Sequence, residues 1–326
     1  MRSIRRVLVA IKDPSSRSQP AVIKGAQIAK ALGARLELFH AITSTLYADL
    51  YIEGEGSAKD MERKAQAQVC KQLSAIAGRL RGHGAKVTVA AEWDFPAYEA
   101  VVRRADRVKA DLIVAERHAG RHFAPWHLHL NDWELLRSSR APVLLVKSSG
   151  AYRHPVVLAA VDPSLFEKPA KLDDVILHVG AAVTHALRGT LHVVHAHPSV
   201  LSGTMPRDAF SPTKAAGMNS DFIAAAKAQL DRLLRSTTIP RSRRHLNGNP
   251  PIEAIQEVAR AIRSNIVVMG ALSRSGLKGM FIGNTAESLF DLLTCDLLIV
   301  KPQNFANRVR AARRGARVIP LTPVCD

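Results

Sequence analysis

Residues 267–276 read Val267-Val268-Met269-Gly270-Ala271-Leu272-Ser273-Arg274-Ser275-Gly276, and Gly283-Asn284-Thr285-Ala286-Glu287 follows shortly after. Three apolar residues lead into a glycine-containing loop, and the second segment stands where a helix would begin. Glycines allow close approach to an anion and positive φ, and the free N–H groups of a helix N-terminus attract negative charge. The two segments together predict a strand, a phosphate-binding loop and a helix.

The chain repeats itself, which indicates two fused copies of one domain. Asp13-Pro14-Ser15 recurs as Asp162-Pro163-Ser164, 149 residues later. Two further segments recur at an offset of 154 residues: Pro96-x-x-Glu99-Ala100-Val101 as Pro250-x-x-Glu253-Ala254-Ile255, and Leu144-Leu145-Val146-Lys147 as Leu298-Ile299-Val300-Lys301. A length of 326 residues suits two domains. We expect one at residues 1–150, a second at 151–302, and a basic, disordered tail at 303–326.

Short β-branched apolar runs alternate with alanine-rich helical stretches, a pattern typical of an α/β fold with parallel strands and helices on both faces. The sequence predicts two tandem Rossmann-like domains, each a five-stranded parallel sheet flanked by helices. The strands expected in copy one are Arg6–Ile11, Leu36–His40, Lys86–Ala90, Leu112–Ala115 and Val143–Val146. Those expected in copy two are Val156–Val161, Thr190–His195, a weakly marked run near Arg243–Leu246, Ile266–Met269 and Leu297–Val300.

A helix is expected at Ser220–Arg235, with Ser220 capping its first turn. One face of this helix would be apolar, formed by Phe222, Ala226, Leu230, Leu233 and Leu234. The preceding insertion, Pro198–Asn219, is rich in proline, glycine and serine and is expected to form a lid or a loop.

The spacing G-x2-S-x9-G-N resembles the nucleotide-binding loop of universal stress proteins, with Ser273 where that family usually has glycine. From Val7 to about Pro302, the chain resembles a tandem universal stress protein of the E type. Specific strings carry the resemblance: Gly283-Asn284-Thr285-Ala286-Glu287, Cys295-Asp296-Leu297-Leu298 and Asp132-Trp133-Glu134-Leu135-Leu136-Arg137. It implies an adenine nucleotide alpha hydrolase-like fold and a stress-response adaptor that binds ATP, with Mg²⁺, or another adenine nucleotide.

The resemblance also implies a nucleotide site in copy two. Asp162 matches the aspartate that lies near adenine and ribose in the family, and Ala196 matches the position whose backbone meets the adenine. The expected phosphate loop comprises Gly270, Ser273, Gly283 and Asn284, with Thr285 as a neighbouring hydroxyl at the helix start. The alternative is a glycine loop that only turns a strand into a helix.

Copy one has lost the loop glycines and is expected not to bind ATP in the family manner. The offset of 154 places Glu116, Ala119, His122, His129 and Leu130 at the loop positions, and only Asp13 survives from the expected set. A carboxylate at Glu116 would repel phosphate, and two imidazoles would occupy its space. Copy one is therefore expected to be a structural or regulatory half.

No catalytic residue is predicted. The chain lacks G-x-S-x-G, and Gly276-Leu277-Lys278-Gly279 lacks the order of a P-loop. A low-turnover ATPase or autophosphorylating protein stays open as an alternative, as does a binding module for another anionic or lipid-like ligand. His118, His122, His127 and His129 are spaced closely enough for zinc, but no acid or cysteine cluster accompanies them, so no metal site is predicted.

The net charge of +18 would suit an anionic partner. Because aromatic residues make up only 5% of the chain, no specific nucleic-acid binding is expected. No apolar run is long enough to span a membrane, and a cytoplasmic location is expected. The expected partners are an adenine nucleotide and an unknown protein. Pairing between the copies would form an intramolecular pseudo-dimer, and a homodimer is an option.

Overall fold

The computed structural model describes residues 3–43, 58–82, 85–94, 96–117, 127–164, 171–197, 212–270, 284–302, 304–306 and 308–309. The side chains of residues 58–62, 127–131, 212–219, 284, 285 and 287 are not part of this description. The chain folds into two compact units. The N-terminal unit comprises Arg2–Tyr152 together with residues from Phe305 onward, and the C-terminal unit comprises Arg153–Asn304.

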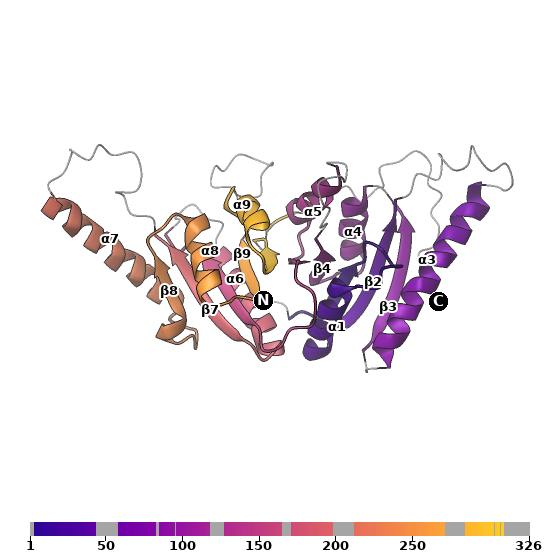
Figure 1. Cartoon of the computed structure of the whole chain (residues 1–326), viewed down its shortest axis with the longest axis horizontal. Helices are drawn as coiled ribbons and strands as arrows, with labels where there is room; N and C mark the ends of the chain where they lie inside the picture. The colour runs from indigo at the N-terminus through magenta and orange to yellow at the C-terminus, as the bar shows by residue number, and fades with distance from the viewer. Residues whose placement is uncertain are drawn as a thin grey trace. The chain divides into compact units, whose positions relative to one another are not determined.

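The N-terminal unit contains a parallel sheet with the strand order β3-β2-β1-β4-β5. Helices flank these strands (Figure 1). The strands are β1 Arg6–Ala10, β2 Arg35–Ile42, β3 Val87–Trp93, β4 Leu112–Glu116 and β5 Val143–Val146. The helices are α1 Pro20–Leu32, α3 Ala58–Arg81, α4 Ala97–Arg107 and α5 His127–Ser138.

The C-terminal unit repeats this arrangement with the strand order β10-β9-β6-β7-β8. Its strands are β6 Val156–Val161, β7 Thr190–Ala196, β8 Arg244–Asn247, β9 Ile266–Gly270 and β10 Asp296–Val300. Its helices are α6 Leu172–Ala186, α7 Pro212–Leu233, α8 Pro251–Ala261 and α9 Asn284–Leu292, with the 3₁₀ turn η3 at Arg241–Arg243. Both sheets confirm the expected tandem α/β architecture.

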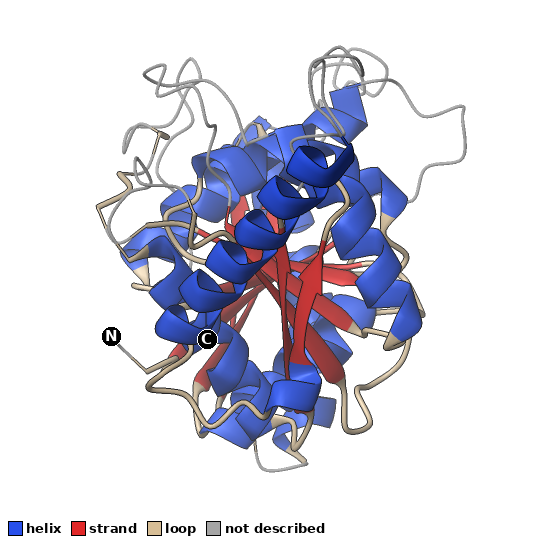
Figure 2. Ribbon diagram, turned by 90° about the vertical axis from the view of Figure 1, so that its left-hand side faces the viewer, coloured by secondary structure: helices blue, strands red, loops and turns tan. Residues whose placement is uncertain are grey.

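The central strands are buried on both faces because helices cover the two sides of each sheet (Figure 2). Leu8, Val9, Leu158 and Val267 have no exposed surface. Close packing of helix on strand also constrains the helices: a Cβ at Gly25 of α1 would collide with Val9 Cγ2. No helix in the described ranges is long and apolar enough to cross a bilayer.

A buried network of charged side chains joins α4 to the neighbouring strands in the N-terminal unit. Arg103 donates from Nε and Nη2 to the two carboxylate oxygens of Asp94 at 2.9 and 2.8 Å, and from Nη1 to Glu99 at 2.8 Å. Arg104 donates to Glu37 at 2.6 Å and to Glu92 at 3.0 Å. Burial opposes the charged form, yet these carboxylates raise the pKa of both guanidinium groups.

The helix expected at Ser220–Arg235 begins eight residues earlier, at Pro212, so Ser220 lies inside α7 and does not cap it. The end of the expected loop Pro198–Asn219 is therefore helical, while residues 198–211 lie outside the described part. Ala226, Leu230 and Leu234 are buried as expected.

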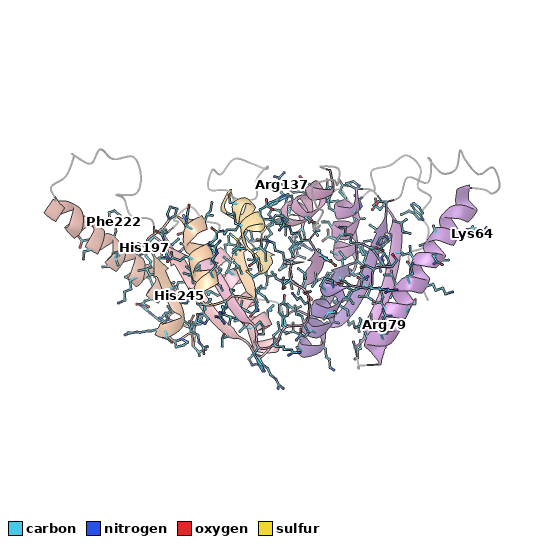
Figure 3. All side chains as sticks on the ribbon, in the orientation of Figure 1. Lys64, Arg79, Arg137, His197, Phe222 and His245 are labelled. Atoms are coloured by element: carbon cyan, nitrogen blue, oxygen red, sulfur yellow. The ribbon has the colours of Figure 1, made fainter. Side chains whose placement is uncertain are left out.

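Phe222 was expected on that buried face but is 49% exposed (Figure 3). This exposure agrees with the difference in length between α7 and β8. α7 has 22 residues, or about 33 Å of helix, whereas β8 has four residues, or about 13 Å of strand. Among the described side chains of α7, those of residues 220–225 are exposed and burial begins at Ala226.

We expect Leu230→Ala to lower the free energy of unfolding by about 2–4 kcal/mol, because Leu230 is only 3% exposed. Phe222→Ala, on the same helix, should cost less than about 1 kcal/mol. Urea unfolding of both variants measures the difference. Equal losses would show that α7 packs through a different face.

Candidate functional site

Three neighbouring strands of the C-terminal unit end together and bring the sequence-predicted residues to one edge of the sheet. β6 lies between β7 and β9, with Val161 opposite His195 and Ala160 opposite Met269. Asp162 therefore follows β6 beside the last residues of β7 and β9, which are Ala196 and Gly270. The chain continues from β6 to β7 and from β9 to β10, in opposite directions across the sheet. Open α/β sheets bind ligands at a point of this kind.

Asp162 is held by a tight turn that leaves its carboxylate partly accessible, with 25% of the side chain exposed. Its Oδ1 accepts a hydrogen bond from Ser164 Oγ at 2.5 Å, and its backbone N–H donates to Asp173 Oδ1 of α6 at 3.2 Å. Each carboxylate oxygen can accept more than one hydrogen bond, so a partly exposed carboxylate at a strand end can also accept bonds from ligand hydroxyls.

His195 is the most unusual polar group at this edge. Its side chain is 1% exposed, and within the described part of the chain neither ring nitrogen makes a hydrogen bond of standard geometry, although the Val161 backbone acts on the ring as a weak partner. Nδ1 lies 4.0 Å from Asp162 Oδ1. Burial lowers the pKa of His195, although Asp162 opposes this shift, so the ring is neutral at pH 7 with one donor and one acceptor.

Gly270 ends β9 where α6 approaches the sheet. A Cβ there would lie 2.6 Å from Leu172 Cδ2 at the start of α6, so a larger residue would displace a buried leucine. The glycine thus has a packing role, independent of any ligand.

The remaining predicted loop residues are placed only in part. Ser273 and Gly283 lie outside the described residues, so the phosphate loop itself stays a prediction. Asn284 and Thr285 are the first two residues of α9, as the sequence predicted for the helix start. The positive end of the α9 dipole thus begins at the predicted phosphate position.

The N-terminal unit keeps the aspartate turn and a histidine at the end of the neighbouring strand, His40, whose Nδ1 lies 2.8 Å from the carbonyl oxygen of Ile11. Asp13 Oδ1 accepts bonds from the backbone N–H and the hydroxyl of Ser15 at 2.8 and 2.6 Å, which lower the pKa of Asp13. Glu116 ends β4, where the C-terminal unit has Gly270. His129 and Leu130 lie in the first turn of α5, while Ala119 and His122 lie outside the described residues. The four histidines considered as zinc ligands lie within residues 118–129, whose side chains the structure does not describe.

Sequence reasoning missed a second histidine feature, a stacked pair on β7 and β8. The rings of His192 and His245 have centroids 5.2 Å apart and an interplanar angle of 13°, and Nδ1 of the first lies 2.9 Å from Nε2 of the second. Burial lowers the pKa of both, and the neighbouring positive charges of His245 and Arg243 add to the effect at His192. His192, His195 and His197 along one strand were the available signal; Figure 3 labels His197 and His245.

A family model described as "Universal stress protein family" matches residues 3–147 and again 156–301. The chain belongs to the universal stress protein family. Universal stress protein E of Escherichia coli (strain K12) is 25% identical over 316 residues, covering 95% of this chain and 98% of that protein. A universal stress protein E homolog of Haemophilus influenzae is 31% identical over 175 residues, covering 52% of this chain and 55% of that protein.

The solved structures agree with this membership at the level of fold. Protein PA1789 from Pseudomonas aeruginosa PAO1, described as functionally unknown, has a TM-score of 0.70 and 22% identity, covering 92% of this chain and 94% of that one. The two matched segments and the near-complete coverage by an E-type relative confirm the expected tandem universal stress protein.

We expect stability to fall as the pH is lowered from about 7 to 5, because unfolded histidine binds a proton below about pH 6.5 while buried His195 resists it. Replacing His195 with leucine should flatten this dependence, by at most about 1.4 kcal/mol per pH unit for one proton. Urea unfolding at a series of pH values, with hydrogen exchange of β6 and β7 amides, measures the slope. An unchanged slope would mean that His195 protonates equally in both states.

Proposed function

We propose that this universal stress protein is a stress-response adaptor that binds ATP or another adenine nucleotide in its C-terminal unit. Binding, and not catalysis, is the proposed role, and the nucleotide state would govern contact with a protein partner in the cytoplasm. The observation that carries the proposal is the convergence of Asp162, Ala196 and Gly270 at one edge of the sheet, beside the buried His195.

The chemistry of these groups fits an adenine nucleoside. Asp162 can accept hydrogen bonds from ribose hydroxyls, because its carboxylate is partly exposed. The neutral His195 ring and the backbone at Ala196 offer both a donor and an acceptor, which suits the alternating donors and acceptors of a purine edge.

The phosphates would extend from β9 toward the start of α9. Gly270 ends β9 without a side chain, and α9 begins at Asn284 with its free N–H groups and positive dipole end. Magnesium, if bound, would be held largely by phosphate oxygens and water, because the described residues contain no cluster of three or more potential metal ligands.

The proposal assigns one nucleotide per chain. Glu116 stands at the end of β4, where phosphates would pass in the N-terminal unit, and a carboxylate there repels them. The N-terminal unit retains the Asp13 turn and His40, but it has Glu116 in place of the glycine at the strand end.

Calorimetric titration with Mg-ATP should show one site per chain with a micromolar Kd, or about −8 kcal/mol. Asp162→Ala should weaken binding by about 10–100-fold, because it removes a charge-assisted hydrogen bond. Asp13→Ala is the matched control, since Asp13 occupies the same turn in the other copy, and it should leave the Kd unchanged.

Three outcomes would contradict the proposal. Two equivalent sites, or an equal loss in both variants, would place binding elsewhere or in both copies. Absence of binding, together with a non-nucleotide ligand extracted from the purified protein, would favour the anionic or lipid-like alternative. Phosphate release that Asp162→Ala abolishes would favour a low-turnover ATPase.

A further inference from the structure

A second candidate site lies in the N-terminal unit, at the edge of its sheet where the strands begin and not where they end. A cavity of about 710 Å³ opens at the amino ends of β1, β2 and β3. Its size falls in the range of small-molecule sites. Five of its lining residues are basic and one is acidic; the basic residues are Arg6, Arg35, Arg81, Lys86 and Arg107, and the acidic residue is Glu37.

Strand register forms the row of positive charge. Arg6 and Arg35 are the first residues of β1 and β2 and stand opposite each other, so both side chains leave the same face of the sheet. Lys86 precedes Val87, the partner of Leu36, and its carbonyl accepts the N–H of Leu36 at 3.0 Å. It therefore continues the row from β2 to β3.

The last residues of two helices complete the lining of the cavity. Arg107 is the last residue of α4 and Arg81 the last of α3, which runs beside β3. Figure 3 labels Arg79, two residues before Arg81, where α3 reaches the beginning of β3. Arg81 is oriented by two bonds from its guanidinium to the carbonyl of Val87, at 3.2 and 2.8 Å.

The carboxylates near the cavity are already engaged. Glu37 accepts a bond from Arg104 at 2.6 Å, and Glu92 accepts bonds from Arg104 and Arg107 at 3.0 and 2.6 Å. Asp111 accepts the backbone N–H groups of Arg5 and Arg6 at 2.8 and 3.0 Å.

Within the described residues, no hydrogen bond or ion pair engages the side chain of Arg35 or Lys86. Both are accessible at the cavity. Like charges brought together at a concave surface repel one another, and a bound anion relieves this repulsion.

The C-terminal unit provides a partial internal comparison. The register pair that opens β6 and β7 is Val156 with Thr190, in place of Arg6 with Arg35. Ala261 ends α8 where Arg107 ends α4. The stretch that leads into β8 remains basic, with η3 at Arg241–Arg243. The fold therefore does not require the Arg6–Arg35 pair or a cation at the Arg107 position.

From this arrangement we propose that the cavity at the amino ends of β1–β3 binds a small molecule carrying two or more phosphate groups. Guanidinium forks bind phosphate oxygens bidentately, and four of the five cations are arginines. None of the described residues that line the cavity is aromatic, which disfavours recognition through base stacking. The site is separate from the nucleotide site proposed for the C-terminal unit and does not depend on it.

The test is calorimetric titration of the full chain with inorganic tripolyphosphate at about 150 mM salt, where the Debye length of about 8 Å suppresses diffuse attraction. We expect one site per chain, weakened at least tenfold in the double variant Arg35→Gln with Lys86→Gln. Arg17→Gln with Lys30→Gln is the matched control, because it removes the same charge from exposed positions of the same unit that do not line the cavity. This control should retain the wild-type Kd.

Hydrogen exchange of the wild-type chain gives an independent readout, and it does not require any variant to fold. Tripolyphosphate should protect amides at the beginnings of β2 and β3. Absence of binding, an equal loss in both double variants, or protection only around Asp162 and Gly270 would each overturn the proposal.

Discussion

Burial of a parallel sheet on both faces is the constraint on which the rest of this structure depends. Strands such as β4 and β9 are apolar along nearly their whole length because helices cover both of their sides. The candidate sites lie where strands begin or end, while carboxylates within strands, such as Glu37 and Glu92, are paired with arginines. Asp162 and Gly270 lie where strands of the C-terminal unit end, and Arg6 and Arg35 lie where strands of the N-terminal unit begin.

The sequence predicted strands better than helices, for physical reasons. A strand buried on both faces is a continuous apolar run, so β5 and β6 were expected at the bounds that the structure has, and even the weakly marked β8 was placed within a residue. The start of α7 was wrong because apolar spacing is visible only where a helix packs. Among the described side chains of α7, those of residues 220–225 are exposed, and burial begins only at Ala226.

The candidate sites were likewise predictable only in part. Family resemblance identified Asp162, Ala196 and Gly270, and the strand ends bring these residues together. The pairing of His192 with His245 and the row from Arg6 to Lys86 depend on which residues stand opposite each other in neighbouring strands. Register of this kind is set by the whole sheet, and no local pattern in a single sequence encodes it.

The buried network of Arg103 and Arg104 has a consequence for how the two copies diverged. Losing one member leaves a buried charge without its partner, which costs far more than the intact pair contributes. Single substitutions at Asp94, Glu99 or Arg103 should therefore lower the free energy of unfolding strongly, whereas replacing all three together with apolar residues should not. The C-terminal copy has Val258 at the position of Arg104 and Glu257 at that of Arg103, but it keeps Glu253 at the position of Glu99. One acidic member of the network is thus common to both copies, whereas the two arginines are specific to the N-terminal copy.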